Sequence, residues 1–262
     1  MRTPIITIFV ICVLIIGLAL AFYDYRKHGI RYDKVDISRS QSDSLKNARL
    51  AGEEQSYKKN YDAAVAEYEK ALKLSPRDAY LRNDLGAAYY YLGLKYMEPP
   101  IEEEDFSLGT EIDGRHISKE ETIQKFGEAL EKVKSGMITV VSNNQLVAKE
   151  IESYARPLNH YAHLELEKTD EGVWEYWVTI ITGRTKDAFL NAEKQYLTAI
   201  SLRAVKDTDG RKYSNYSAAS RNLGTLYFRM GKKKEAISNW RRSLQIEPTD
   251  AELRELVDKY ER

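Results

Sequence analysis

The side chains best suited to metal chemistry lie close together in the middle of the chain. His160 and His163 stand three residues apart, and Glu167 follows four residues later. On a helix the three side chains would share one face, and imidazole and carboxylate groups are ordinary zinc ligands. The chain offers no obvious fourth ligand. A solvated helix face is therefore the favoured interpretation, with metal binding as the alternative.

Other candidate reactive sites are weaker. Asp207 to Gly210 reads DTDG, which resembles the start of a calcium loop but lacks further oxygen ligands at regular spacing, so a tight turn is expected. Gly86 and Gly93 do not belong to either Gly-rich phosphate-binding pattern, and close helix packing explains them better. The single cysteine, Cys12, lies in an apolar run, and no nucleophile elbow is present. We predict a non-enzymatic protein without a cofactor.

Composition narrows the choice of partner. The chain has 262 residues, 43% of them apolar, which is enough to bury a core. Lys plus Arg equal Asp plus Glu at 40 each, so no net charge attracts the protein to nucleic acid. With 19 tyrosines but only 14 glycines and six prolines, the composition favours packed helices. Nucleic acid is not an expected partner.

The N-terminal segment has the character of a membrane helix. No charge occurs from Thr3 to Tyr23, and 21 helical residues span about 31 Å, close to the roughly 30 Å hydrocarbon core of a bilayer. A cleaved signal peptide is the alternative, because Ala19-Leu20-Ala21 fits a cleavage site. The bulky Phe22 and Tyr25 near the outer edge favour an uncleaved single-pass anchor over residues 1–24.

The orientation of this anchor stays open. One basic residue, Arg2, precedes the apolar run, and four follow it closely: Arg26, Lys27, Arg31 and Lys34. Counting basic residues near the ends favours the cytoplasmic side for the larger part, but one short N-terminal tail does not decide the side. Residues 25–44 are polar and partly serine-rich, which is typical of a linker.

Two distant segments share one pattern of residues. LGAAYYYLG, from Leu85 to Gly93, and LGTLYFRMG, from Leu223 to Gly231, both read Leu-Gly-x-x-Tyr-x-x-x-Gly. A second match aligns on prolines, with small, aromatic, small and proline positions at Ala64, Tyr68, Ala71 and Pro76 and again at Ala236, Trp240, Ser243 and Pro248. Repetition at this scale indicates stacked structural units.

These motifs resemble the tetratricopeptide repeat family. In that family two antiparallel helices fill 34 residues, and successive pairs stack into a superhelix with a concave inner surface. The resemblance implies an all-α protein, an α-solenoid of about five antiparallel helix pairs that is irregular in the middle and follows a single transmembrane helix.

The expected domain spans residues 45–262. Its second repeat contains an acidic insertion of unknown role, and its delayed second helix is expected around Phe126 and Ala129, which echo the aromatic-then-alanine step. The predicted parts are repeat 1 at 45–78, repeat 2 at 79–135 with the insertion 94–117, divergent helical repeats at 137–206, the last repeat at 217–250 and a capping helix at 251–262.

The resemblance also implies where a ligand would bind. Peptide ligands of this family lie along the inner surface, which the first helix of each pair lines. A subfamily that clamps a terminal carboxylate has Asn directly after the first-repeat Gly; here Glu53 takes that place, so no carboxylate clamp is expected. The corresponding positions in this chain are Arg49, Glu53, Tyr57, Asn83, Asp84, Tyr90, Tyr91, Arg221, Asn222, Thr225, Phe228 and Arg229.

Two functions fit the sequence. The favoured one is a membrane-anchored, non-catalytic scaffold or adaptor that binds partner proteins or peptides on its concave face, in the assembly of a membrane-associated complex. The alternative is an exported ligand- or metal-binding helical-repeat protein with a cleaved signal peptide, whose site would include His160 and His163. The sequence gives no oligomeric state.

Overall fold

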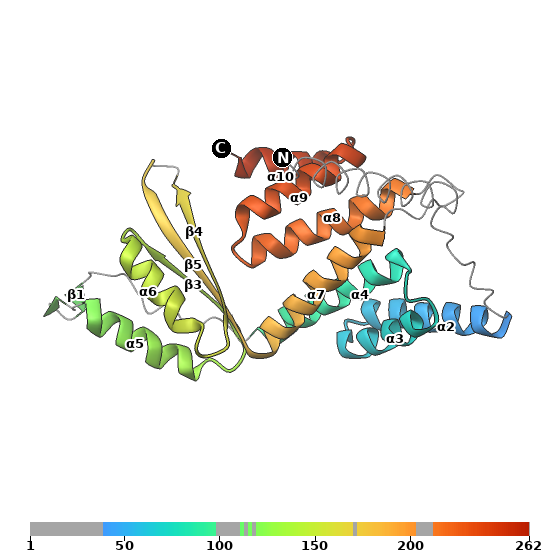
Figure 1. The fold of residues 1–262 in the computed structure, drawn as a ribbon, viewed down its shortest axis with the longest axis horizontal. Coiled ribbons are helices and arrows are strands. Elements are labelled where there is room, and N and C mark those ends of the chain that lie inside the picture. Colours follow the sequence, from blue (N-terminus) through green and yellow to red (C-terminus); the bar gives the residue numbers. More distant parts are fainter. Residues whose placement is uncertain are drawn as a thin grey trace, which may run out of the picture. The chain divides into compact units, whose positions relative to one another are not determined.

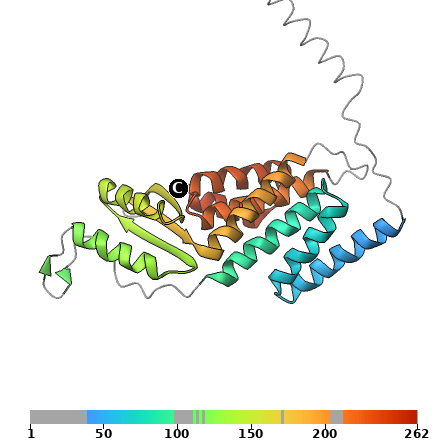
Figure 2. The ribbon, with the colours of Figure 1, turned by 60° about the horizontal axis from the view of Figure 1, so that its bottom comes forward.

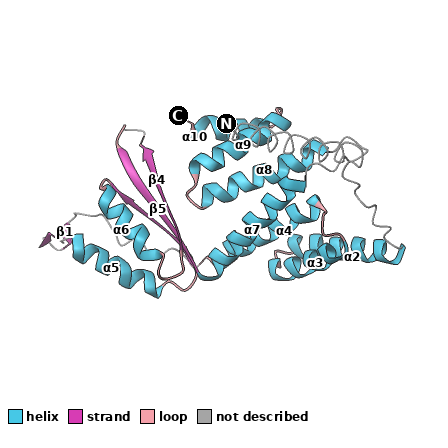
Figure 3. Cartoon of the chain, viewed as in Figure 1, coloured by secondary structure: helices cyan, strands magenta, loops and turns pink. Residues whose placement is uncertain are grey.

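Antiparallel helix pairs and one inserted α/β segment make up the fold (Figures 1 and 3). The computed structural model describes residues 39–97, 111–112, 115–116, 119–169, 172–202 and 212–261. None of the helices among these residues is long and apolar enough to cross a membrane. The predicted anchor 1–24, most of the predicted linker and most of the acidic insertion lie outside the described residues.

The first helix pair overlaps the predicted repeat 1 at 45–78, but its first helix begins earlier, within the predicted linker 25–44. Helix α2 spans Arg39–Tyr57 and helix α3 spans Tyr61–Leu74. Gly52 allows close approach of the two helices, because a Cβ atom at this position would lie 2.6 Å from the Tyr68 ring. The small side chains that flank Tyr68 on α3, Ala64 and Ala71, are fully buried.

The second helix pair is interrupted by the insertion. Its first helix, α4, spans Ala79–Tyr96, and its partner is α7, Gly183–Ser201. A Cβ atom on Gly86 would lie 2.7 Å from the ring of Tyr196, the same relation that Gly52 has to Tyr68. The prediction that residues near Phe126 supply the second helix of this repeat is therefore wrong.

The third pair is regular and carries a capping helix. Helices α8 and α9 span Lys212–Arg229 and Lys233–Ile246, and α10 spans Ala251–Tyr260. Gly224 faces Trp240, as Gly52 faces Tyr68 and Gly86 faces Tyr196 in the other two pairs. Outside the insertion, the described residues thus form three helix pairs with this contact, where about five pairs were predicted (Figure 2).

The insertion between α4 and α7 contains strands. A two-stranded hairpin is followed by a three-stranded antiparallel sheet in the order β3-β5-β4. Strands β3 and β4 are both antiparallel to β5, and α6 connects them, which gives a split β-α-β arrangement. The elements are β1 (Glu111–Ile112), β2 (Arg115–His116), α5 (Lys119–Lys132), β3 (Gly136–Ser142), α6 (Gln145–Ala155), β4 (Tyr161–Lys168) and β5 (Trp174–Thr182).

The two faces of this sheet are buried in different cores. Val140, Val178 and Ile180 face α5 and α6, where they pack with apolar side chains of both helices. Ile181 joins the core that α7 and α8 share, and Met137 packs against it. Only the helices α6 and α7 agree with the predicted helical repeats over 137–206; the three strands contradict that prediction, because this segment buries alternate side chains on two faces.

Candidate partner-binding surface

Polar contacts join the first helices of neighbouring pairs. The Nη2 atom of Arg49 on α2 lies 3.8 Å from the Oδ2 atom of Asp84 on α4. The side-chain amide of Asn222 on α8 donates to Asn83 on α4, with 3.0 Å between the two atoms. The structure therefore brings predicted ligand positions from three repeats side by side. The four side chains in these contacts bind one another and join the first helices.

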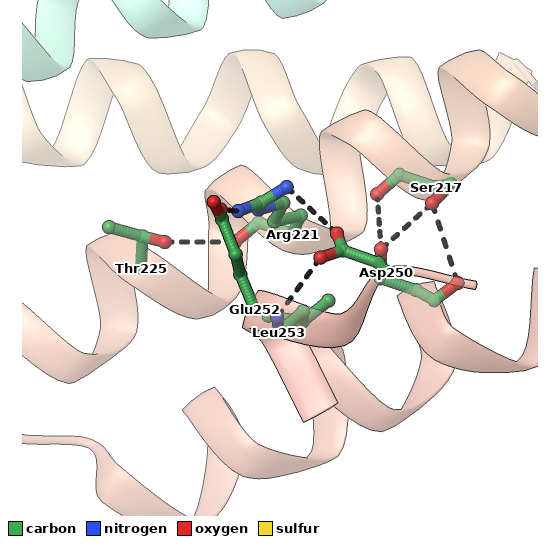
Figure 4. A network of polar contacts seen from close by, with 7 residues as sticks. Ser217, Arg221, Thr225, Asp250, Glu252 and Leu253 are labelled. Atoms are coloured by element: carbon green, nitrogen blue, oxygen red, sulfur yellow. Dashed lines mark hydrogen bonds and ion pairs between the residues drawn. The ribbon is translucent and has the colours of Figure 1, made fainter. Parts of the chain in front are cut away.

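The last repeat is tied to the capping helix in the same way (Figure 4). Arg221 places Nη1 2.8 Å from Asp250 and Nη2 3.4 Å from Glu252. Thr225 donates its hydroxyl to the backbone carbonyl of Arg221 at 3.2 Å. Asp250 also caps α10, since its carboxylate accepts from the N–H of Leu253. Arg221 and Thr225 thus have internal partners.

Two of the predicted ligand aromatics are packed against other rings. Phe228 packs against both Trp240 and Tyr260, with ring centroids 5.5 Å and 4.6 Å away. Tyr90 stacks on Phe189 of α7 at 5.8 Å. Both side chains are partly buried and pack against the cores of their helix pairs, so their first role is structural.

Three of the exposed predicted positions occupy the same place on the three first helices. Tyr57, Tyr91 and Arg229 stand five residues after the glycines of their repeats. Tyr57 is 90% exposed and Tyr91 48%, and Arg229 is also exposed. Among the described residues Arg229 has no ion-pair partner. We call Tyr57, Tyr91 and Arg229 the exposed row.

Neighbouring rings hold the middle member of this row. Tyr91 stacks on Tyr61 at the start of α3, with ring centroids 5.3 Å apart and planes inclined by 16°. The ring of Tyr90 meets Tyr91 edge-on, also at 5.3 Å. Because Tyr91 is held from two sides, it presents a fixed aromatic surface at low entropic cost to a ligand.

The carboxylate of Asp84 has an unusual environment. Burial raises the pKa of Asp84 to about 6, although the guanidinium of Arg49 acts in the opposite direction. Glu53, another predicted position, is more exposed and pairs with Arg49 at 3.0 Å. This end of the surface therefore carries one guanidinium between two carboxylates.

The predicted metal ligands do not come together. His160 precedes β4, and His163 and Glu167 lie on this strand instead of a helix. Glu167 forms an ion pair with Lys233 at 2.8 Å. Burial lowers the pKa of His160, and the positive charge of Lys186 nearby lowers it further. No group of three His, Cys, Asp or Glu side chains within the described part of the chain is arranged to hold a metal ion.

Sequence reasoning missed the contact between the insertion and the third repeat. Glu165 on β4 is only 7% exposed and accepts from the backbone N–H groups of Lys233 and Lys234, at 2.6 Å and 3.3 Å. Tyr161 donates its hydroxyl to the carbonyl of Met230 at 3.2 Å. The alternating sequence LELE of β4, Leu164 to Glu167, could have indicated this contact, because it places two carboxylates on one face of a strand.

Comparison with known protein families supports the repeat assignment. A family described as TPR repeat matches residues 56–93, and one described as Tetratricopeptide repeat matches residues 222–250. The chain contains tetratricopeptide repeats. The first match covers α3 and most of α4, from two successive pairs, and the second covers the C-terminal part of α8 with all of α9. The TPR frame therefore lies on both sides of the inserted sheet.

Solved structures of other TPR-like proteins match at low identity. PilF of Pseudomonas aeruginosa is 12% identical over 82% of this chain and 66% of its own length, with a TM-score of 0.27. Two MamA structures are 16% and 17% identical, cover 84% and 80% of this chain and 88% and 89% of their own, and have TM-scores of 0.22. This chain therefore spans about two thirds of the PilF chain. No curated protein matches it.

Proposed function

We propose that this protein is a non-catalytic scaffold that binds an extended segment of a partner protein across the exposed row. The observation that supports this proposal most is the equivalence of Tyr57, Tyr91 and Arg229: each stands at the same position of a TPR pair, and each is accessible. TPR helices generally bind other proteins through their first-helix surface, which fits this placement.

The chemistry of the row defines the partner segment. Tyrosine and arginine contribute strongly to binding energy at protein interfaces. Arg229, which has no ion pair among the described residues, would bind a carboxylate of the partner. Tyr57 and Tyr91 would pack against apolar or proline side chains. The partner segment therefore combines apolar residues with an acidic one.

We also propose that residues 1–24 anchor the scaffold in a membrane. The uncharged run from Thr3 to Tyr23 supports this, and the count of basic residues favours the cytoplasmic side for the repeats. An anchor would raise the concentration of the repeats near membrane-bound partners. Resistance of the full chain to carbonate extraction, and protection of the repeats from protease added outside intact cells, are the expected results. Release by carbonate would contradict the anchor.

Affinity purification from solubilised membranes tests the scaffold. The variant Tyr57→Ala/Tyr91→Ala/Arg229→Ala should lose partners that the wild type retains. The matched control is Leu190→Ala/Leu197→Ala, which removes two exposed side chains from α7, at 40% and 46% exposure, and should retain them. Equal recovery of every partner by the triple variant would contradict the proposal.

A further inference from the structure

The outer edge of β3 is an unpaired sheet edge within the described part of the chain. β3 pairs with β5 on one side, and no described strand follows on the other. The side chains reflect this position, because Thr139 in the middle of β3 is exposed, whereas Val178 to Thr182 of the central strand are all buried. An open edge leaves backbone N–H and C=O groups available to a further strand.

This edge lacks the features by which proteins normally block strand addition. The sequence GMITVVS, Gly136–Ser142, contains no charge and no proline. Its pairing with β5 is continuous over all seven residues, so no bulge twists the edge away. The opposite edge strand, β4, differs, since it carries Glu165, Glu167 and Lys168 and contacts α9. The chemistry at β3 therefore fits an extended β-strand.

The residue types of β3 are symmetrical about Thr139. Ile138 and Val140 are the β-branched neighbours, and Met137 and Val141 are the next apolar pair. In an antiparallel pair with a second copy, a two-fold axis at Thr139 would place Ile138 opposite Val140 and Met137 opposite Val141. An isologous contact needs such self-complementarity. No like charges would meet, and β-branched cross-strand pairs are favourable.

We infer that β3 pairs with β3 of a second copy of this chain, so that two three-stranded sheets form one continuous sheet. A two-fold axis normal to the sheet keeps the helices α5 and α6 of both copies on the same face. Ile138 and Val140 already lie on that face, where Val140 is buried and Ile138 only partly. Dimer formation would complete the burial of Ile138. This inference is independent of the proposed partner binding.

Cross-linking of the full chain tests the pairing directly. In a Cys12→Ser background, Thr139→Cys places one cysteine beside its copy across the strand pair, where opposite Cβ atoms lie about 5 Å apart. A short bis-maleimide reagent should convert most of this variant into a covalent dimer. The control Leu166→Cys, on the exposed part of β4, should stay monomeric. Cross-linking of the control alone, of both variants equally, or of neither would overturn the inference.

Charge reversal supplies a second test that does not depend on cysteine chemistry. The full chain in detergent should have the protein mass of a dimer by light scattering. Thr139→Lys and Thr139→Glu should each be monomeric, because like charges meet at the axis, while an equimolar mixture should regain the dimer mass. Leu166→Lys should remain a dimer, and circular dichroism should show an unchanged fold for each variant. A monomeric wild type, a dimeric Thr139→Lys, or a mixture that stays monomeric would overturn the inference.

Discussion

Gly86 in α4 lies against the ring of Tyr196 in α7, although 110 residues separate them in the chain. In the first repeat the same contact joins Gly52 and Tyr68, which are 16 residues apart. The inserted segment therefore occupies the turn inside the second repeat. Turns of this kind tolerate long insertions because the ends stay close together and the cost of a longer loop grows slowly.

A double-mutant cycle tests this pairing. Tyr196→Ala should lower the free energy of unfolding by about 3–5 kcal/mol, because the ring is 2% exposed. Gly86→Ala should destabilise the wild type by forcing its Cβ against the ring. In the Tyr196→Ala background it should be neutral or stabilising, since alanine is the better helix former by about 1 kcal/mol. Urea unfolding followed by circular dichroism gives the four values.

Phe126→Ala is the control for that cycle. Phe126 is buried in the core of the insertion, away from α4. The effects of Phe126→Ala and Gly86→Ala on the free energy of unfolding should therefore be additive within about 0.5 kcal/mol. Coupling of Gly86 to Phe126 with no coupling to Tyr196 would restore the sequence-based assignment of the second helix.

The sequence predicted the uninterrupted repeats and failed at the divided one for a physical reason. The small-aromatic-small spacing of Ala192, Tyr196 and Ala199 was visible, but spacing does not say which first helix such a segment packs against. Phe126 and Ala129 show the aromatic-then-alanine part of the same pattern and lie closer to α4 in the sequence. Closeness in the sequence identifies the two helices of a repeat only where no domain is inserted between them.

The strands and the surface were predictable to different degrees. The run WEYWVTII of β5 is mostly apolar and becomes buried on both faces from Val178 on, as expected of a central strand. A short run of this kind does not distinguish strand from helix. The repeat frame placed Tyr91 and Arg229 on an accessible surface. It did not show that Phe228 and Tyr90 are packed, because their partners Tyr260 and Phe189 come from outside the first helices.

Asp84 should make stability depend on pH. Its pKa is raised to about 6 in the folded protein from an ordinary value of 3.8. The contribution of the protonated Asp84 to the free energy of unfolding is therefore complete below about pH 4 and is lost as pH rises through 6. Asp84→Asn should therefore gain stability relative to wild type between pH 4 and 7. The gain is at most about 3 kcal/mol, and loss of the Arg49 contact reduces it. Denaturant unfolding across this range measures the difference, and a constant offset would contradict the prediction.

Glu165 should stabilise α9 from the neighbouring sheet. Glu165→Ala removes the acceptor for two backbone N–H groups at the start of this helix and should cost about 1–3 kcal/mol. Glu167→Ala, which removes a more exposed ion pair with Lys233, is the control and should cost less than about 1 kcal/mol. Hydrogen exchange should show faster opening of α9 in the first variant only; equal effects would argue against the cap.

Two adjacent residues on α8 should behave differently. Phe228→Ala should lower the free energy of unfolding by up to about 3 kcal/mol, because the ring packs against Trp240 and Tyr260. Arg229→Ala should change it by no more than about 0.5 kcal/mol but reduce partner recovery. Thermal unfolding and affinity purification of the two variants check this. A stable Phe228→Ala, or a strongly destabilised Arg229→Ala, would show that the roles are assigned wrongly.

Site-specific photo-cross-linking in cells is the most direct measurement of the proposed scaffold function. A benzophenone side chain in place of Tyr91 should capture a discrete partner, and the adduct should weaken when Tyr57→Ala and Arg229→Ala are added. The same group in place of Leu197, which is exposed on α7, should capture none. Adducts at residue 197 but not at residue 91, or an adduct at 91 that ignores the loss of Tyr57 and Arg229, would contradict partner binding at the exposed row.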